Sequence, residues 1–178
     1  DNKLQYVYQT SWGMTTRLIG AIIMVHGDDS GLVLPPRIAP VQVMVIPIQQ
    51  QKEGVLDTAR DVCERMGKVC RAKLDDSDKS PGYKFSEQEM RGIPLRVEIG
   101  PRDIENGVCV VVRRDTSEKL EVRIDELDGK IAELLVQMQK DMYDRAKTFL
   151  EEHTSSATNM DELVDIVNTK RGFVKAMW

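Results

Sequence analysis

The sequence contains few features of disulfide-rich, membrane-spanning or strongly basic proteins. It has three cysteines, which cannot all pair with one another, and none of them has C-x-x-C spacing. We therefore expect free thiols in a reducing cytoplasm rather than disulfides or a metal site. The longest apolar run, residues 18–25, is too short to span a bilayer, so no membrane segment is expected. The net charge of −4 gives no overall attraction to RNA, so any RNA contact must be local.

The sequence also lacks the residue patterns of nucleophilic catalysis. No Ser–His–Asp or Cys–His arrangement is recognisable, so a covalent mechanism is not indicated. Asp28 and Asp29 are adjacent and could suggest a metal site. Neighbouring carboxylates point to different sides of a turn, however, so capping or solvation is the better interpretation and no metal is expected.

The composition, 41% hydrophobic and 30% charged, is ordinary for a globular protein, and the length allows one large domain or two small ones. A β-branched run at residues 41–48 predicts a strand buried on both faces. In the strand 95–99, alternation places Arg96 and Glu98 outward. Ser86 and Glu89 form a capping-box pattern that predicts a helix from residue 86. Further strands are expected at 69–74, 108–112 and 119–124, and helices at 55–67 and 127–153. This order favours a mixed α/β sheet.

The ends of the sequence are less regular. Residues 3–8 alternate and predict a half-buried antiparallel strand, whereas residues 15–25 fit a helix or a strand. Residues 32–34 predict a short strand, and Pro35-Pro36 predicts a domain boundary near residues 35–40. Near the other end we expect a polar linker at 154–159, a helix at 160–168, and a strand or extended tail at 172–178.

Arg17 precedes the apolar run 18–25, which is expected to be packed on all sides. A guanidinium there needs an anion, so the pattern fits a structural ion pair or an anion site equally. Trp12 could be a core residue or the wall of an apolar pocket, and His26 a capping residue or a ligand contact. Residues 71–103 carry balanced charges, which fits either a solvated face or direct readout of base edges.

Two strings in the sequence resemble a known family. TSWG-x-TTR-x-IG, followed by MVHGDD-x-GLVLPPR, resembles the third signature motif of class II aminoacyl-tRNA synthetases, in the version of archaeal- and eukaryotic-type prolyl-tRNA synthetases. SPG-x-KF-x-x-x-E-x-x-G-x-P-x-R-x-E-x-GPRD resembles the anticodon-binding domain of the same family. The resemblance runs nearly end to end, although Tyr83 stands where the family often has Trp.

The resemblance implies a fold and a division into domains. The expected fold is α/β: the end of a class II synthetase antiparallel catalytic sheet, followed by a mixed α/β anticodon-binding domain. Residues 1–37 would be the C-terminal end of the catalytic domain, with the motif 3 helix packed behind its sheet. Residues 38–153 would be the anticodon-binding domain, and residues 154–178 a linker and the start of a C-terminal domain. We therefore expect a piece of a longer protein.

The resemblance also assigns residues to two sites. In the active site, Arg17 would be the catalytic residue that grips the triphosphate of ATP. The other ATP-binding residues would be Gln9 and Thr10, and the proline-binding residues Trp12, Gly13 and His26. The anticodon-binding residues, which would read the two guanines shared by proline anticodons, are Phe85, Glu89, Arg96, Arg102 and Asp103.

The implied function is that of a proline–tRNA ligase, with ATP and Mg²⁺, proline and proline tRNA as its substrates. The family is expected to form homodimers through the missing catalytic region, and any structural zinc would belong to the missing C-terminal region. The chain alone would be inactive. The alternative is a non-catalytic tRNA- or RNA-binding module with an anticodon-binding fold, although such a module would have no reason to keep TSWG-x-TTR.

Overall fold

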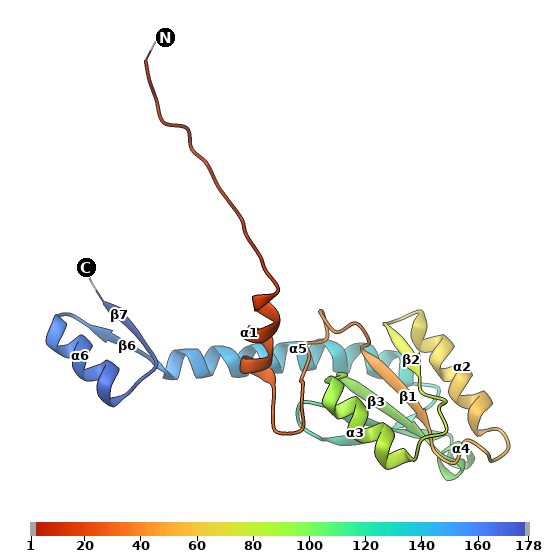
Figure 1. The fold of residues 1–178 in the computed structure, drawn as a ribbon. Helices are drawn as coiled ribbons and strands as arrows, with labels where there is room; N and C mark the ends of the chain where they lie inside the picture. Colours follow the sequence, from red (N-terminus) through yellow and green to blue (C-terminus); the bar gives the residue numbers. More distant parts are fainter. Residues whose placement is uncertain (1–2, 177–178) are drawn as a thin grey trace.

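The computed structural model describes residues 3–176, which form an α/β domain with extensions at both ends (Figure 1). An extended segment, residues 3–15, leads into α1 (Arg17–His26) and then into the domain. The long helix α5 (Leu127–Glu152) leaves the domain and carries a small unit of two strands and one helix at its far end. None of the helices in this described part is both long and apolar enough to cross a membrane.

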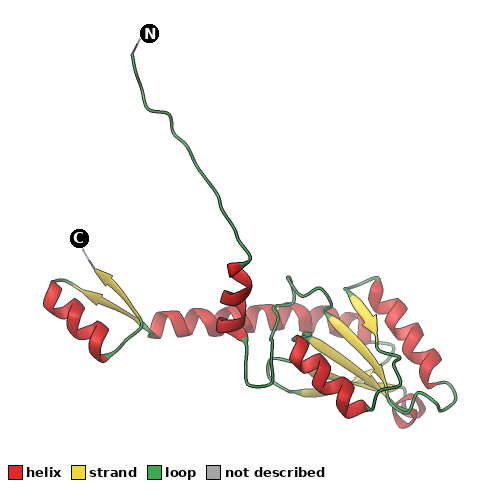
Figure 2. Cartoon of the chain, in the orientation of Figure 1, coloured by secondary structure: helices red, strands yellow, loops and turns green. Residues whose placement is uncertain are grey.

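The domain is built on a mixed five-stranded sheet with the strand order β2-β1-β3-β4-β5. Figure 2 draws the strands in yellow, with helices beside the sheet in red. β1 pairs in parallel with both β2 and β3, whereas β4 pairs antiparallel with β3 and β5. This confirms the predicted mixed α/β sheet. The strands are β1 (Val43–Pro47), β2 (Ala72–Leu74), β3 (Leu95–Ile99), β4 (Val108–Arg113) and β5 (Lys119–Arg123).

Apolar side chains cover both faces of the central strands. On one face, Val43 and Val45 pack in the main core with α2 (Val55–Gly67) and the first half of α5. On the other face, Met44 and Ile46 form a smaller cluster that includes Phe85 of α3 (Pro81–Arg91). Every residue of β1 is buried, as its continuous apolar run predicts.

Two helix boundaries near the candidate anticodon residues differ from prediction. α3 begins at Pro81 instead of residue 86, because Ser80 accepts a hydrogen bond from the Tyr83 amide (3.4 Å) and proline suits the first turn. The predicted capping box at Ser86 was therefore wrong, since that residue lies inside the helix. The short helix α4 (Pro101–Asn106), which follows Gly100, was not predicted.

The N-terminal predictions are corrected in three respects. Residues 3–8 are extended and exposed and form no strand, because no strand of the described chain lies beside them to pair with their amides. Residues 15–25 adopt the helical alternative, but α1 buries none of its residues and lies against α5, not behind a sheet. Residues 32–34 form no regular strand either; Leu32 and Leu34 instead donate to the carbonyls of Met90 and Gly92, both at 3.1 Å.

At the C-terminal end the predicted polar linker was wrong. Residues within it form β6 (Thr154–Ala157), which pairs in parallel with β7 (Phe173–Ala176) across α6 (Met160–Thr169). The expected strand or tail is thus a strand up to Ala176, and its last two residues lie outside the described part. The apolar stripe of α5 is buried as far as Met142, but Phe149 is exposed because the helix extends past the sheet.

Candidate nucleic-acid interface

A hollow of about 300 Å³ lies on the α3 side of the sheet, where β3 and β4 emerge from under the helix. Three of the five predicted anticodon residues line it: Phe85, Glu89 and Arg96. Phe85 and Glu89 are four residues apart in α3, so both side chains project from one face of the helix. Arg96 lies on the strand beneath them.

Arg96 is held in one plane by three contacts. Its Nη1 donates to Glu89 Oε1 (3.1 Å), its Nε donates to Glu98 Oε1 (2.9 Å), and its guanidinium carbon lies 4.2 Å from the centre of the Phe85 ring. The side chain was expected on an exposed face, but only 7% of Arg96 is exposed because α3 covers the strand. Within the described chain Nη2 has no acceptor, which leaves donors for a planar base in the hollow.

Arg114, at the wall of the hollow, joins it to the loop that follows α1. Its Nη1 and Nη2 donate to the two carboxylate oxygens of Asp28 (2.7 and 2.6 Å), and its Nε donates to the Glu89 carbonyl (2.9 Å). The hydrogen bond from Arg114 lowers the pKa of Asp28 to about 2. Sequence reasoning missed this pair, because 86 positions separate the two residues and only the fold brings them together.

Arg113 also lines the hollow and is neutralised in a similar way. Its Nε and Nη2 donate to the two carboxylate oxygens of Asp115 (3.0 and 2.9 Å), and Nη2 also reaches Asp141 on α5 (2.8 Å). The hydrogen bonds that Arg113 donates to Asp115 are the main reason why the pKa of Arg113 is raised. The hollow is therefore rich in arginine but not strongly cationic, which favours recognition of a base edge over attraction of backbone phosphate.

The other two predicted anticodon residues lie past the opposite end of β3. Asp103 Oδ2 accepts a hydrogen bond from the Gly100 amide (2.7 Å), so part of this carboxylate caps α4. Arg102 is exposed and has no ion pair within residues 3–176. Both line a second hollow, of about 440 Å³, together with Gln49 and Lys52. The structure thus divides the five predicted residues into two groups.

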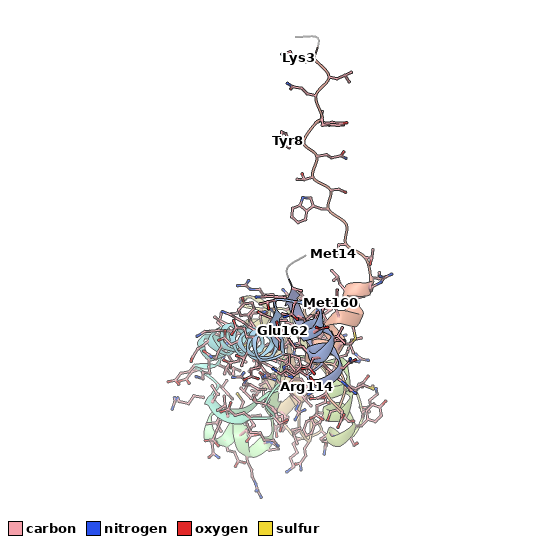
Figure 3. All side chains as sticks on the ribbon, turned by 90° about the vertical axis from the view of Figure 1, so that its left-hand side faces the viewer. Lys3, Tyr8, Met14, Arg114, Met160 and Glu162 are labelled. Carbon is pink, nitrogen blue, oxygen red and sulfur yellow. The ribbon has the colours of Figure 1, made fainter. Side chains whose placement is uncertain are left out.

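The predicted active-site residues are not assembled into one site within the described chain. Gln9, Thr10, Trp12 and Gly13 lie in the extended segment, and Trp12 is 94% exposed. Figure 3 shows that this segment, from Lys3 to Met14, projects away from the remainder of the molecule. Arg17 and His26 stand at the first and last positions of α1. Partial burial is the main cause of a lowered pKa at His26, and the charge of Arg145 adds to it.

No cluster of three or more histidine, cysteine, aspartate or glutamate side chains suited to a metal ion occurs between residues 3 and 176. The three cysteines are free thiols, and Cys109 is buried. Burial is also the first cause of the raised pKa of Cys70, about 11, and of Cys109, about 12. These thiols are therefore protonated at neutral pH and are poor nucleophiles or metal ligands.

Comparison with known proteins gives matches over the whole chain. A family model described as an anticodon binding domain matches residues 42–134, from the start of the sheet into α5. Over 178 residues the chain is 64% identical to a proline–tRNA ligase of Lachnoclostridium phytofermentans and 60% identical to one of Clostridium novyi. It is 56% identical to a proline–tRNA ligase of Clostridium botulinum. The chain spans 37% of the length of each of these relatives.

Proposed function

The chain belongs to the anticodon binding domain family, and we propose that it supplies the anticodon-binding domain and the end of the catalytic domain of a proline–tRNA ligase of the archaeal and eukaryotic type. The observation that carries this proposal is the 56–64% identity to proline–tRNA ligases across the whole chain. The TSWGMTTR string at residues 10–17 favours an enzyme over a non-catalytic RNA-binding module, which would not need it.

In the complete ligase the proline carboxylate attacks the α-phosphate of ATP, pyrophosphate leaves, and the prolyl group then passes to the terminal ribose of proline tRNA. Arg17 would hold the triphosphate with its forked, permanently charged guanidinium, while Mg²⁺ arrives with ATP. Gln9 and Thr10 would contact the nucleotide. The proline ring would lie against Trp12 and near Gly13 and His26. These residues need the remainder of the catalytic domain, so the chain alone should not activate proline.

In the proposed anticodon site, Phe85, Glu89 and Arg96 form the wall that reads a guanine. The free Nη2 of Arg96 would donate to guanine O6 or N7, and Glu89 would accept from the amino edge. Arg102 and Asp103 would contact the neighbouring nucleotide from the end of β3. This assignment treats residues 38–153 as the anticodon-binding domain, between residues 1–37 of the catalytic domain and residues 154–178 of the linker and C-terminal region. A cytoplasmic homodimer, joined through the catalytic region, is the expected assembly.

The test is binding of the full chain to proline tRNA and to an unrelated tRNA at a fixed salt concentration, since RNA affinities depend on salt. We expect tighter binding to proline tRNA, and this preference should disappear when its two anticodon guanines are replaced. Equal affinity for all these RNAs would contradict anticodon recognition. Pyrophosphate exchange in the complete enzyme then separates a ligase from a binding module.

A further inference from the structure

The sheet places a crevice at the carboxyl ends of β1 and β3. In the order β2-β1-β3, strand β2 lies on one side of β1, and the next strand along the chain, β3, lies on the other. Open α/β sheets bind ligands outside the carboxyl ends of the strands at such a switch point. Two segments meet there: the loop of residues 48–54 after β1, and Gly100 with the first turn of α4 after β3. The Ile48 amide joins them by donating to the Ile99 carbonyl (2.8 Å).

The second hollow, of about 440 Å³, lies between these two segments, with Gln49 and Lys52 on one side and Arg102 and Asp103 on the other. Lys52 and Arg102 are exposed, and neither forms an ion pair with any residue from 3 to 176. In the first hollow, by contrast, Arg96, Arg113 and Arg114 are all paired with carboxylates. Lys52 and Arg102 outnumber the one carboxylate at the second hollow, that of Asp103, so an anionic group would be stabilised there.

The loop that carries Gln49 and Lys52 is held in place by its own contacts. Gln50 Nε2 donates to the carbonyls of Asp76 and Ser77, both at 3.2 Å, and the Lys52 amide donates to the Gln49 carbonyl (2.9 Å). Gln49 has a φ of 57°, a left-handed conformation that is unfavourable for glutamine and must be maintained by the surrounding structure. A loop ordered in advance loses little entropy when it binds a ligand.

We infer that Gln49 and Lys52 form, together with Arg102, a second RNA-binding subsite on the anticodon side of the domain. Lys52 binds a backbone phosphate of the anticodon loop beside the nucleotide that Arg102 contacts, and the Gln49 amide contacts the base edge of the adjoining nucleotide. Arg96 lines the first hollow and Gly100 the second. Their separation of four residues corresponds to about 13 Å of strand, a distance that a short single-stranded RNA segment spans. The inference rests on the proposed function, because the RNA is taken to be proline tRNA.

The test measures Kd of the full chain for proline tRNA between 50 and 200 mM salt. Lys52→Ala should weaken binding about three- to tenfold and reduce the slope of log K against log salt by about 0.7, the value for one single-strand phosphate contact. Lys52→Arg keeps the charge and should retain both the affinity and the slope. Lys68→Ala is the matched control, because Lys68 is an exposed lysine at the other end of α2 and should leave both quantities unchanged.

Gln49→Gly tests the amide contact without adding strain, because glycine adopts a positive φ readily. It should weaken binding two- to fivefold with an unchanged salt slope. If the wild-type chain prefers proline tRNA but Lys52→Ala and Gln49→Gly bind as tightly as wild type, the subsite is overturned while the proposed function stands. If wild type shows no preference for proline tRNA, both are overturned. A loss of affinity that Lys52→Arg shares would show damage to the loop and would also overturn the phosphate contact.

Discussion

At the scale of single residues, Arg96 is the group whose geometry most constrains what the first hollow can bind. Its guanidinium is stacked on Phe85 and paired with Glu89 and Glu98, so it presents a fixed edge. Lysine could keep the charge but could not reproduce the forked donors. Substitution by alanine would leave both carboxylates without this partner, so a loss of RNA binding could not be separated from a loss of folding stability.

We therefore predict that Arg96→Lys weakens binding of proline tRNA by about 1–3 kcal/mol, the value of one good base contact. The same variant should lose much less affinity for a tRNA whose anticodon guanines have been replaced. The measurement is Kd for both RNAs, with the melting temperature as a check on folding. Equal losses for both RNAs would assign Arg96 a purely structural role.

The second residue-scale prediction concerns Asp28 and Arg114. The pKa of Asp28 falls from its ordinary 3.8 to about 2 in the folded chain because Arg114 donates to it. A carboxyl group whose pKa is lower in the folded than in the unfolded chain stabilises the fold at pH values above its unfolded pKa. The contribution of Asp28 is therefore complete above about pH 4 and is lost as the pH falls toward 2. Because the Asp28 side chain is 48% exposed, solvent screening limits the contribution to about 1 kcal/mol.

Asp28→Asn should accordingly unfold at a lower denaturant concentration than wild type at pH 7, and the difference should disappear near pH 2. Urea titrations of both proteins across that range measure it. Asp29→Asn is the control, because the side chain of Asp29 has no hydrogen bond or ion pair within the described residues. A difference that persists unchanged at pH 2 would show that the ion pair is not its source.

At the scale of elements, the connection between residues 31–34 and the end of α3 fixes the helix that carries Phe85 and Glu89. Gly92 has a φ of 70°, and a Cβ there would lie 2.6 Å from the Leu32 backbone. Gly92→Ala should therefore destabilise the chain by roughly 2 kcal/mol, through strain and the forced separation of the two segments. Thermal or urea unfolding checks this.

The same helix contains a matched control. Gly82 also belongs to α3, but a Cβ there would meet nothing within 4 Å. Gly82→Ala should stabilise the helix by about 0.5–1 kcal/mol, because alanine loses less backbone entropy on folding. If both substitutions changed the stability in the same direction, close packing would not be the reason why residue 92 is glycine.

The same elements show what a sequence pattern can and cannot predict. β1 was predictable because a continuous apolar run has few alternatives to a buried strand. The start of α3 was missed because two capping signals, at Ser80 and Ser86, lie close together and only the first is used. β6 was missed because its residues, TSSA, are polar and become a strand only by pairing with β7. The burial of Arg96 likewise depended on where α3 lies.

At the scale of the whole molecule, the two predicted sites occupy different parts of the chain. The anticodon residues were predicted from a motif and lie on the folded domain, where they form two hollows. The predicted active-site residues extend along residues 9–26. Large apolar side chains of residues 3–26 are exposed, among them Tyr6, Tyr8 and Trp12. Exposed apolar surface of this kind marks an interface, and we propose that the remainder of the catalytic domain covers it.

This separation yields a crossed prediction for the complete ligase. Arg17→Ala should abolish pyrophosphate exchange, because the ATP triphosphate loses its cation, and should leave Kd for proline tRNA within about twofold of wild type, since Arg17 on α1 does not line the anticodon hollows. Arg96→Lys should reverse the pattern, with weak tRNA binding and normal exchange at saturating ATP and proline. An unchanged exchange rate in Arg17→Ala would remove that residue from the chemistry. Equal damage to both activities in either variant would mean that the two sites are not separable, because loss of a contact confined to one site leaves the other at full strength.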